Sequence, residues 1–530
     1  MKRITYLLIC VISLIGGGCT NLLETNSELL GNVVTKVERL DTLEVTLEVA
    51  GTLAEKIGDK KDVISKLIVS GPFDADDVTT MKALPKLQSI DMKGVIIVGG
   101  DKTYNSWYKL EDNVIGKFMF GNLSSFLLEE LILPTTIIAI DDEAFRGMYN
   151  LKSLDIPDGV NVIGTCAFFD CSGLESITLP SKLKVIEAET FQDCAKLSFI
   201  LLPEKLIAIK QYAFYNCRSI ETVVIPENVN EIGDNAFASC FKLHSIFWNT
   251  SAVFPNVYSY NVGGNRAEGG NMNCLLYLAD ENTQIDDKEW KNIIINGEAD
   301  QIVLSSVRPY PFNTTGNFYC PQAFKALKIS YSRNFSSLTY PNEPAGWESI
   351  SLPFTPTQIK HEDGRVLAPF NSGNDNTKPF WLRRLTANGF ENVTSFEANV
   401  PYIIAMPNNE KYAAEYNIAG TVIFSAENAT NGILIPATTD LSKEEGPSFR
   451  FCSNYERIPK NAATYVLHKD YDSHKTGSMF VRSERDALPF EAYVATKNIS
   501  AKAPAMFSVN SSVNTRSNRT IGGKPDIDDM

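Results

Sequence analysis

The stretch LESITLPSKLKVIEAETFQDC, residues 174–194, sets the pattern on which much of the chain is built. The stretch LKSLDIPDGVNVIGTCAFFDC, residues 151–171, precedes it by 23 residues and has apolar residues at the same positions. The spacing continues from about Leu128 to Trp248, and most units share a leading leucine, a proline, an isoleucine, a phenylalanine and a closing cysteine. A fixed period of this length with apolar residues in phase predicts a solenoid of stacked coils.

The repeated positions form ladders of single residue types. The ladders comprise Pro134, Pro157, Pro180, Pro203 and Pro226; Ile140, Ile163, Ile186, Ile209 and Ile232; Phe145, Phe168, Phe191, Phe214 and Phe237; and Cys171, Cys194, Cys217 and Cys240. Within one unit, Leu154 and Ile156 alternate with Ser153 and Asp155, which predicts a short strand with its apolar side inward. We expect each phenylalanine to lie on the one in the next coil, where burial of one ring contributes roughly 1.5–3 kcal/mol.

These units resemble the BspA-like (treponemal-type) leucine-rich repeats, whose pattern L-x-x-I-x-L-P…I-x-x-x-A-F-x-x-C they follow over roughly residues 128–248. Thr190 stands at the usual alanine, and Met148 replaces the first ladder cysteine. The resemblance implies a leucine-rich-repeat solenoid. Together with the export signal described below, it also resembles surface lipoproteins of Bacteroidetes, which are described as adhesins or ligand-binding surface proteins.

The first nineteen residues have the features of an export signal. Lys2 and Arg3 precede an apolar run, residues 4–15, that is too short to span a bilayer as a mature helix. Three glycines then lead to Cys19, and small residues before a cysteine resemble the bacterial lipobox, although Gly16 stands where a branched aliphatic residue is usual. We expect cleavage before Cys19 and lipidation of that residue. The alternative is an ordinary secretory signal, which would also export the protein.

Composition restricts the classes of partner and chemistry. The 530 residues suffice for two or three domains, and 44% hydrophobic with 21% charged residues is ordinary for a folded protein. A net charge of -14 argues against a nucleic-acid partner. The four histidines are scattered, and no CxxC pair, HExxH, G-x-S-x-G or P-loop motif occurs. We therefore expect no enzyme activity, no cofactor and no metal site, and we expect the ladder cysteines to be free thiols that fill the core.

The pattern divides the chain into seven segments. Residues 1–18 are the predicted lipoprotein signal peptide, 19–40 a tether, 41–120 an N-terminal cap of the solenoid and 121–250 the leucine-rich repeats; 251–305 are a C-terminal cap and linker, 306–505 a β-sandwich domain and 506–530 a disordered tail. Within these segments we expect short helices at Asp76–Leu84 and Asp286–Ile295. The predicted fold class is therefore mainly β with short helices, a leucine-rich-repeat solenoid followed by a β-sandwich-like domain.

The β-sandwich prediction rests on short alternating strands after Pro309. The runs GWESISLPF, NVPYIIAMPN and LPFEAYV look like a C-terminal β domain found beside such repeats in Bacteroidetes surface proteins. The domain also contains Trp347, Trp381, Tyr402 and Tyr493, which could stack on sugar rings. Such aromatic residues more often fill β interiors.

If the repeat strands stack as predicted, two rows of residues point away from the core and form what we call the outer face. The rows are Glu130, Ser153, Ser176, Phe199, Thr222 and Ser245, and Ile132, Asp155, Thr178, Leu201, Val224 and Phe247. The early coils place mainly polar residues there and the later coils apolar ones, and an exposed apolar cluster often marks a contact surface. The candidate ligand-binding residues are therefore Phe199, Leu201, Thr222, Val224 and Phe247. Alternatively, the following domain folds back over this cluster.

These observations predict a non-catalytic binding or adhesion protein that is exported, lipid-anchored to the outer membrane and exposed at the cell surface. Its partner would be another protein, of a host or of a bacterial surface, and it would touch the membrane only through the lipid. The alternative is a glycan-binding or glycan-degrading lipoprotein that acts through the C-terminal β domain. A purely architectural envelope protein is a third hypothesis.

Overall fold

The computed structural model describes residues 41–508 except for 122–126, 254–272, 280, 282, 284–290, 307–315, 340–345, 371–377, 387–388, 410–411, 413–416, 442, 446–448, 462, 469–476, 478, 483–484 and 497–505. Cys19, the predicted signal peptide and the tether lie outside these residues. The chain forms two compact units, one made of Met1–Asn271 with Leu278–Lys288 and the other of Met272–Tyr277 with Glu289–Met530. Within the described residues, no helix has both the length and the apolar character needed to cross a membrane.

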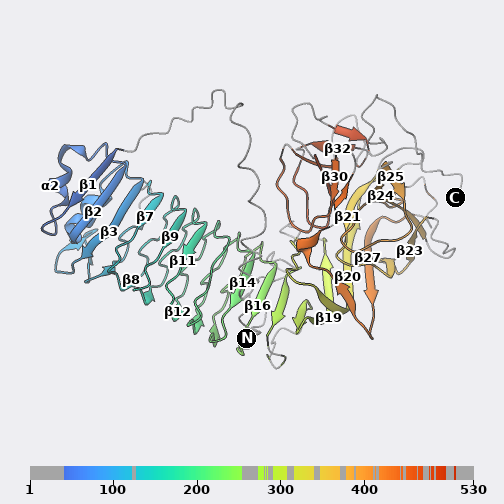
Figure 1. Ribbon diagram of the computed structural model, residues 1–530, viewed down its shortest axis with the longest axis horizontal. Coiled ribbons are helices and arrows are strands. Elements are labelled where there is room, and N and C mark those ends of the chain that lie inside the picture. Colours follow the sequence, from blue (N-terminus) through green and yellow to red (C-terminus); the bar gives the residue numbers. More distant parts are fainter. Residues whose placement is uncertain are drawn as a thin grey trace. The chain divides into compact units, whose positions relative to one another are not determined.

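The first unit is a solenoid whose strands pair in parallel from coil to coil (Figure 1). Its first sheet has the order β1-β2-β3-β7, with bounds Thr42–Thr46, Lys66–Phe73, Ser89–Ile97 and Glu130–Ile132. Leu43 pairs with Leu67, Leu67 with Ile90 and Ile90 with Leu131. The segment predicted as a cap therefore already contains coils in register with the repeats, because its apolar positions follow the same spacing.

Among the described residues of the first unit, the helices lie in these early coils. They are α2 (Leu53–Ile57), the 3-10 helix η1 (Gly58–Lys60) and α3 (Ala75–Lys82), and α3 is the helix expected at 76–84. Asp74 caps α3 by accepting hydrogen bonds from the backbone N–H groups of Asp76 and Asp77. The Asp77 carboxylate is fully buried and accepts from the backbone N–H groups of Gly51 and Leu53, at 2.6 and 2.8 Å. Through these hydrogen bonds, the carboxylate connects the turn before α2 to α3.

Most repeats contribute short strands along two edges of the solenoid. On the outer-face edge these are β9 (Ser153–Asp155), β11 (Ser176–Thr178), β14 (Thr222–Ile225) and β16 (Ser245–Trp248). On the second edge they are β6 (Val114–Ile115), β8 (Ala139–Ile140), β10 (Val162–Ile163), β12 (Val185–Ile186), β13 (Ala208–Ile209) and β15 (Glu231–Ile232). As predicted, Leu154 and Ile156 are buried whereas Ser153 and Asp155 are exposed.

The phenylalanine ladder forms the centre of the stack. The five predicted rings are at most 1% exposed, and neighbouring rings lie nearly parallel with centroids 4.8–5.4 Å apart. Phe120 adds a sixth ring, 5.3 Å from Phe145. The backbone supports the ladder, since the N–H of Phe168 donates to the Thr190 carbonyl in the next coil at 2.9 Å. The stack is therefore held by side chains and main chain together, and the prediction of equivalent coils is confirmed.

Each repeat turns its corner through left-handed residues. One such position is occupied by Glu143, Cys166, Glu189, Tyr212 and Asn235, with φ between 55° and 58°. This explains Cys166, the cysteine outside the ladder, because the position tolerates many residue types. Its thiol lies 3.5 Å from Oε2 of Glu189, and burial together with that carboxylate raises the pKa of Cys166 to about 12.

The second unit is built from strands in two sheets. The first sheet has the order β18-β19-β20-β27-β22-β23-β24-β26-β21, with β25 and β28 attached. Its strands are β18 (Ile293–Ile295), β19 (Glu298–Ser305), β20 (Phe324–Phe335), β21 (Glu348–Ser351), β22 (Gln358–His361), β23 (Val366–Pro369), β24 (Lys378–Thr386), β25 (Gly389–Asn392), β26 (Pro401–Ala405), β27 (Gly420–Glu427) and β28 (Ile433–Ile435). Strand β17 (Leu275–Leu278) lies where the two units divide, and the 3-10 helix η4 (Thr438–Asp440) follows β28.

The second sheet has the order β29-β30-β33-β31-β32-β34. Its strands are β29 (Lys443–Glu445), β30 (Phe449–Cys452), β31 (Thr464–Leu467), β32 (Met479–Arg482), β33 (Tyr493–Thr496) and β34 (Met506–Ser508). Strand β34 falls within the predicted tail 506–530, so the start of that tail belongs to the sheet instead. The rest of the tail, residues 509–530, lies outside the described part of the chain.

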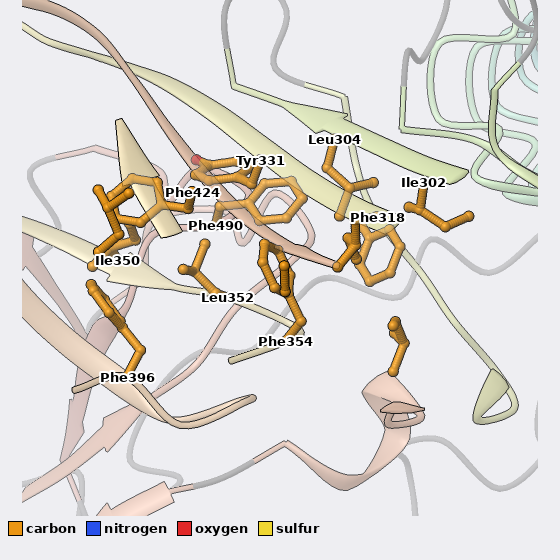
Figure 2. Packing of buried hydrophobic residues seen from close by; sticks show 14 of the residues in the cluster. Ile302, Leu304, Phe318, Tyr331, Ile350, Leu352, Phe354, Phe396, Phe424 and Phe490 are labelled. Carbon is orange, nitrogen blue, oxygen red and sulfur yellow. The ribbon is translucent and has the colours of Figure 1, made fainter. Parts of the chain in front are cut away.

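Two cores explain how these sheets are layered. Tyr402 and Ile404 of β26 belong to one core together with Tyr331 and Phe424, and Figure 2 shows the rings of Tyr331, Phe424 and Phe490 gathered there. Ile403, between them in sequence, belongs to the other core with residues of β30, β31 and β33. Consecutive residues of a strand point to opposite faces, so β26 is buried on both sides. The domain is sandwich-like, with a middle layer that has a core on each side.

One local prediction was wrong. The helix expected at Asp286–Ile295 is not formed at its end, where Ile293–Ile295 are strand β18, which pairs with β19. Three consecutive β-branched isoleucines favour a strand over a helix once a neighbouring strand is available. Residues 286–290 of that prediction lie outside the described residues.

Candidate functional site on the outer face of the repeats

The early coils of the outer face carry mainly polar side chains on regular parallel strands. Strands β9 and β11 pair over three residues, from Ser153↔Ser176 to Asp155↔Thr178. The Thr178 hydroxyl donates to Oδ1 of Asp155 at 2.6 Å. Ile132, on β7, is the apolar exception in these coils and is 49% exposed. Most of this surface is therefore polar and exposed.

The next coil changes the character of the face. Phe199 is 39% exposed and Leu201 54% exposed, although both are large apolar side chains. The backbone changes at the same place, because Phe199 makes only a single bridge to Ser176 and residues 200–202 form no strand. The exposed apolar pair thus lies at an interruption between the β9–β11 sheet and strand β14.

The last coils differ from what the sequence predicted. Thr222 is 8% exposed and Phe247 6% exposed, so neither can serve as an open contact residue, and Val224 is only half-exposed. The reason is that β16 is buried at all four positions and β14 at three of four, on both faces rather than on one. Of the five candidate residues, the structure leaves Phe199 and Leu201 as the open pair, with Val224 partly open.

The ladder thiols lie in the core of the solenoid, where each bonds to a backbone carbonyl. Cys171, Cys194, Cys217 and Cys240 are buried and free, as predicted. Each thiol donates to the carbonyl of a phenylalanine 26 residues earlier, with sulfur–oxygen distances of 3.0–3.3 Å. Burial raises the pKa of Cys240 to about 12. Within the described residues, no group of three or more His, Cys, Asp or Glu side chains could hold a metal ion.

The aromatic residues considered for sugar stacking are partly accounted for by the cores. Trp347 is 4% exposed and Tyr402 1% exposed, so both fill the interior. The Arg383 guanidinium lies over the Trp347 ring, 4.7 Å from its centroid. Trp381 and Tyr493 are half-buried. Two of the four candidate platforms for a sugar are therefore closed.

One exposed aromatic residue was missed by reasoning from the sequence. Trp107 is 82% exposed at the tip of the hairpin formed by β4 (Thr103–Tyr104) and β5 (Tyr108–Lys109). The turn uses two successive left-handed residues, Asn105 and Ser106. Asparagine and serine between two short aromatic runs are a turn signal that could have indicated this hairpin.

The stacked parallel coils, the aromatic ladder and the inward leucines define the first unit as a leucine-rich-repeat solenoid. More specifically, residues 113–244 match the family described as BspA type leucine rich repeat region, in six copies. This part of the chain is therefore a BspA-type leucine-rich-repeat region, as the resemblance implied.

Several solved bacterial structures are similar to the chain. A leucine-rich repeat protein from T. pallidum is 27% identical, with a TM-score of 0.25 over 35% of this chain and 84% of that one. One from Bacteroides ovatus is 19% identical, with a TM-score of 0.25 over 48% and 73%. A leucine-rich cell surface protein from Faecalibacterium prausnitzii is 15% identical, with a TM-score of 0.20 over 42% and 86%. No curated protein matches the chain.

Proposed function

We propose that this protein is a non-catalytic binding or adhesion protein that contacts another protein through the outer face of its repeats. The observation that carries the proposal is the exposed pair Phe199 and Leu201, on a face whose earlier coils are mainly polar. Exposed apolar side chains with a polar surround are typical of a protein contact, in which a few anchors supply most of the binding energy. The repeat family, which suggests a binding or adhesion role, supports the same function.

The proposed location is the outer surface of the cell. Lipidation of Cys19 would hold the protein to the outer membrane, and the partner would be a protein of a host or of another bacterial surface. The test is the variant Cys19→Ala, expressed in a bacterium that processes lipoproteins. We expect it to lose incorporation of labelled fatty acid and to leave the membrane fraction, and persistence of both would contradict the anchor.

The binding proposal is tested on the full chain displayed on cells. Immobilised host and bacterial surface proteins are first screened for those to which cells displaying the wild type adhere. Cells displaying the double variant Phe199→Ser with Leu201→Ser should lose adhesion to these proteins. A matched control replaces Tyr149 and Ile207, which are 53% and 40% exposed and lie off the outer face, by serine. Equal adhesion by the double variant and the wild type would contradict the assignment of this face.

A further inference from the structure

The repeat coils are joined most completely at their left-handed corners. We call the boundary between the coil of Phe199, residues 197–219, and the coil after it the Phe199 interface. At the corner of this interface three N–H groups donate to carbonyls of the next coil, with nitrogen–oxygen distances of 2.7–2.9 Å; they belong to Tyr212, Phe214 and Asn216. The same three bonds recur at every earlier pair of coils from the first repeat onward. We call this row of bonds the corner ladder.

Main-chain bonds also close the Phe199 interface on the second edge of the solenoid. Strands β13 and β15 pair there. The N–H of Asn230 donates to the Ile207 carbonyl at 2.9 Å. Inside the coil, the rings of Phe214 and Phe237 stack across the same interface with centroids 5.0 Å apart. The corner, the second edge and the core are therefore all continuous at this interface.

The outer-face edge is different. A row of backbone bonds links equivalent positions of successive coils, from the N–H of Glu175 to the Lys152 carbonyl at 2.8 Å and from Ser198 to Glu175 at 3.3 Å. The row resumes from His244 to Glu221 at 2.9 Å. In the part of the chain that the structure describes, the intervening bond, from Glu221 to Ser198, is absent, and strand β14 pairs with β16 alone. The Phe199 interface is therefore open along the outer face.

Other gaps in strand pairing are compensated at their own interfaces. Among the described strands, β7 and β9 do not pair, but Lys152 Nζ lies 2.7 Å from Oε2 of Glu129 across that gap. Strands β10 and β12 do not pair on the second edge, but β9 and β11 pair at the same interface. Beyond the prolines that follow the opening, Asn228 Nδ2 donates to the Glu204 carbonyl at 2.9 Å. The opening is thus a short one, bounded on each side by bonded chain.

The side chains beneath the opening remain in the core. Ile200 is 4% exposed and Val223 2% exposed, so the inward positions pack as they do in the closed coils. The backbone outside them lacks the bonds that join the neighbouring coils. Segments with few backbone hydrogen bonds open at a lower cost in free energy than fully bonded ones.

We infer that the solenoid opens locally along the outer face at the Phe199 interface, with the corner ladder as the hinge. The opening moves Phe199 and Leu201 relative to strand β14, while the corner ladder and the phenylalanine stack stay closed. The contact face can thereby adjust its shape without unfolding of a coil. The inference goes beyond the proposed function, since it concerns the free protein and requires no partner.

Hydrogen exchange of the full chain, measured at single amides by mass spectrometry with electron-transfer fragmentation, tests the opening. We expect the amides of Glu221 and Thr222 to have protection factors at least about tenfold lower than those of Glu175 and Ser176, their equivalents two coils earlier. Side-chain exposure predicts the opposite order, because Glu221 is half-buried and Thr222 8% exposed, whereas the two earlier residues are exposed. The amide of Phe214, in the corner ladder, should stay protected.

Two cysteine variants measure access to the core through the opening. Ile200→Cys places a thiol beneath the open stretch, and Ile177→Cys places one at the equivalent position of the previous coil, on β11, which pairs with β9. Iodoacetamide in native buffer should modify the first at least about tenfold faster. The static exposures again predict the reverse, since Ile177 is 8% and Ile200 4% exposed. Modification of Cys217 in the same molecules reports global unfolding.

The outcomes decide between local opening and its alternatives. Equal protection of Glu221 and Glu175, or equal modification of the two variants, would overturn the opening. Loss of protection at Phe214 together with Thr222, or modification of Cys217 as fast as of the introduced thiol, would also overturn it, because the whole coil would then unfold. Adhesion of the variant Phe199→Ser with Leu201→Ser tests the proposed function separately.

Discussion

The thiol of Cys217 donates a hydrogen bond to the backbone carbonyl of Phe191, 26 residues earlier, with 3.0 Å between sulfur and oxygen. The same carbonyl also accepts from the backbone N–H of Cys194 at 3.2 Å. One carbonyl thus joins the end of its own coil to the end of the next. The same arrangement occurs at the other ladder cysteines, so the cysteine fills the core and also links successive coils.

The hydrogen bond from the Cys217 thiol predicts a moderate loss of stability for the variant Cys217→Ala. The variant loses a weak donor and leaves a small cavity, but the carbonyl keeps its backbone partner, so we expect a loss of about 1–2 kcal/mol in the free energy of unfolding. Urea denaturation measures it. A loss as large as that expected below for Phe191→Ala would contradict the minor energetic role of the thiol.

The same thiols should be chemically inert in the native state. Burial raises the pKa of Cys240 to about 12, and the thiolate is the reactive form. We expect the four ladder cysteines to resist alkylation by iodoacetamide until denaturant is added, as peptide mass mapping would record. Rapid modification of Cys240 in native buffer would contradict its placement in the core.

The phenylalanine ladder should dominate the stability of the solenoid. Phe191 is fully buried between Phe168 and Phe214, so Phe191→Ala should cost about 3–5 kcal/mol in the free energy of unfolding. Phe199→Ala is the matched control eight positions away, because its ring is 39% exposed. Thermal melts should show a large shift for the first and a small one for the second. The reverse order would exclude the stacking described here.

The buried ion pair of the second unit should show strong coupling. Arg333 Nη2 lies 2.7 Å from Oε2 of Glu348, with both side chains at most 7% exposed. Removing either partner leaves an uncompensated buried charge, so Arg333→Met or Glu348→Gln should each cost about 3–5 kcal/mol in the free energy of unfolding. The double variant should cost less than the sum of the two, which a double-mutant cycle measures. Additive effects would show that the two residues act independently.

His244 should make stability depend on pH. Burial, with a further contribution from Lys242, lowers the pKa of this imidazole to about 3, from an ordinary value of 6.5. Between these values the unfolded chain binds the proton more readily than the folded one. The stability conferred by neutral His244 is therefore present above about pH 6.5 and lost as the pH falls toward 3, by roughly 1.4 kcal/mol per pH unit.

The difference between wild type and His244→Gln isolates this contribution from the other titrating groups. Denaturant unfolding at several pH values from 3 to 7 would show a steeper decline for the wild type. Parallel curves for the two proteins would contradict the buried, neutral state of His244.

The local pattern of the repeats was sufficient to predict the coils, the inward positions and the free ladder thiols. Each unit determines its own strand and corner through residues close in sequence, and stacking of identical units requires no long-range information. Cys166 was the apparent irregularity. It proved to occupy a left-handed corner position that the sequence pattern does not distinguish.

Which outward residues remain open to solvent could be decided only by the tertiary structure. Leu201 and Phe247 occupy equivalent positions in their coils, yet one is 54% and the other 6% exposed, because β16 is buried on both faces. The middle layer of the second unit and the Arg333–Glu348 pair likewise depend on strands that are distant in sequence. The periodic sequence thus determined the coil, since its interactions repeat between neighbouring units, and the tertiary structure determined the surface, since burial depends on segments that the period does not describe.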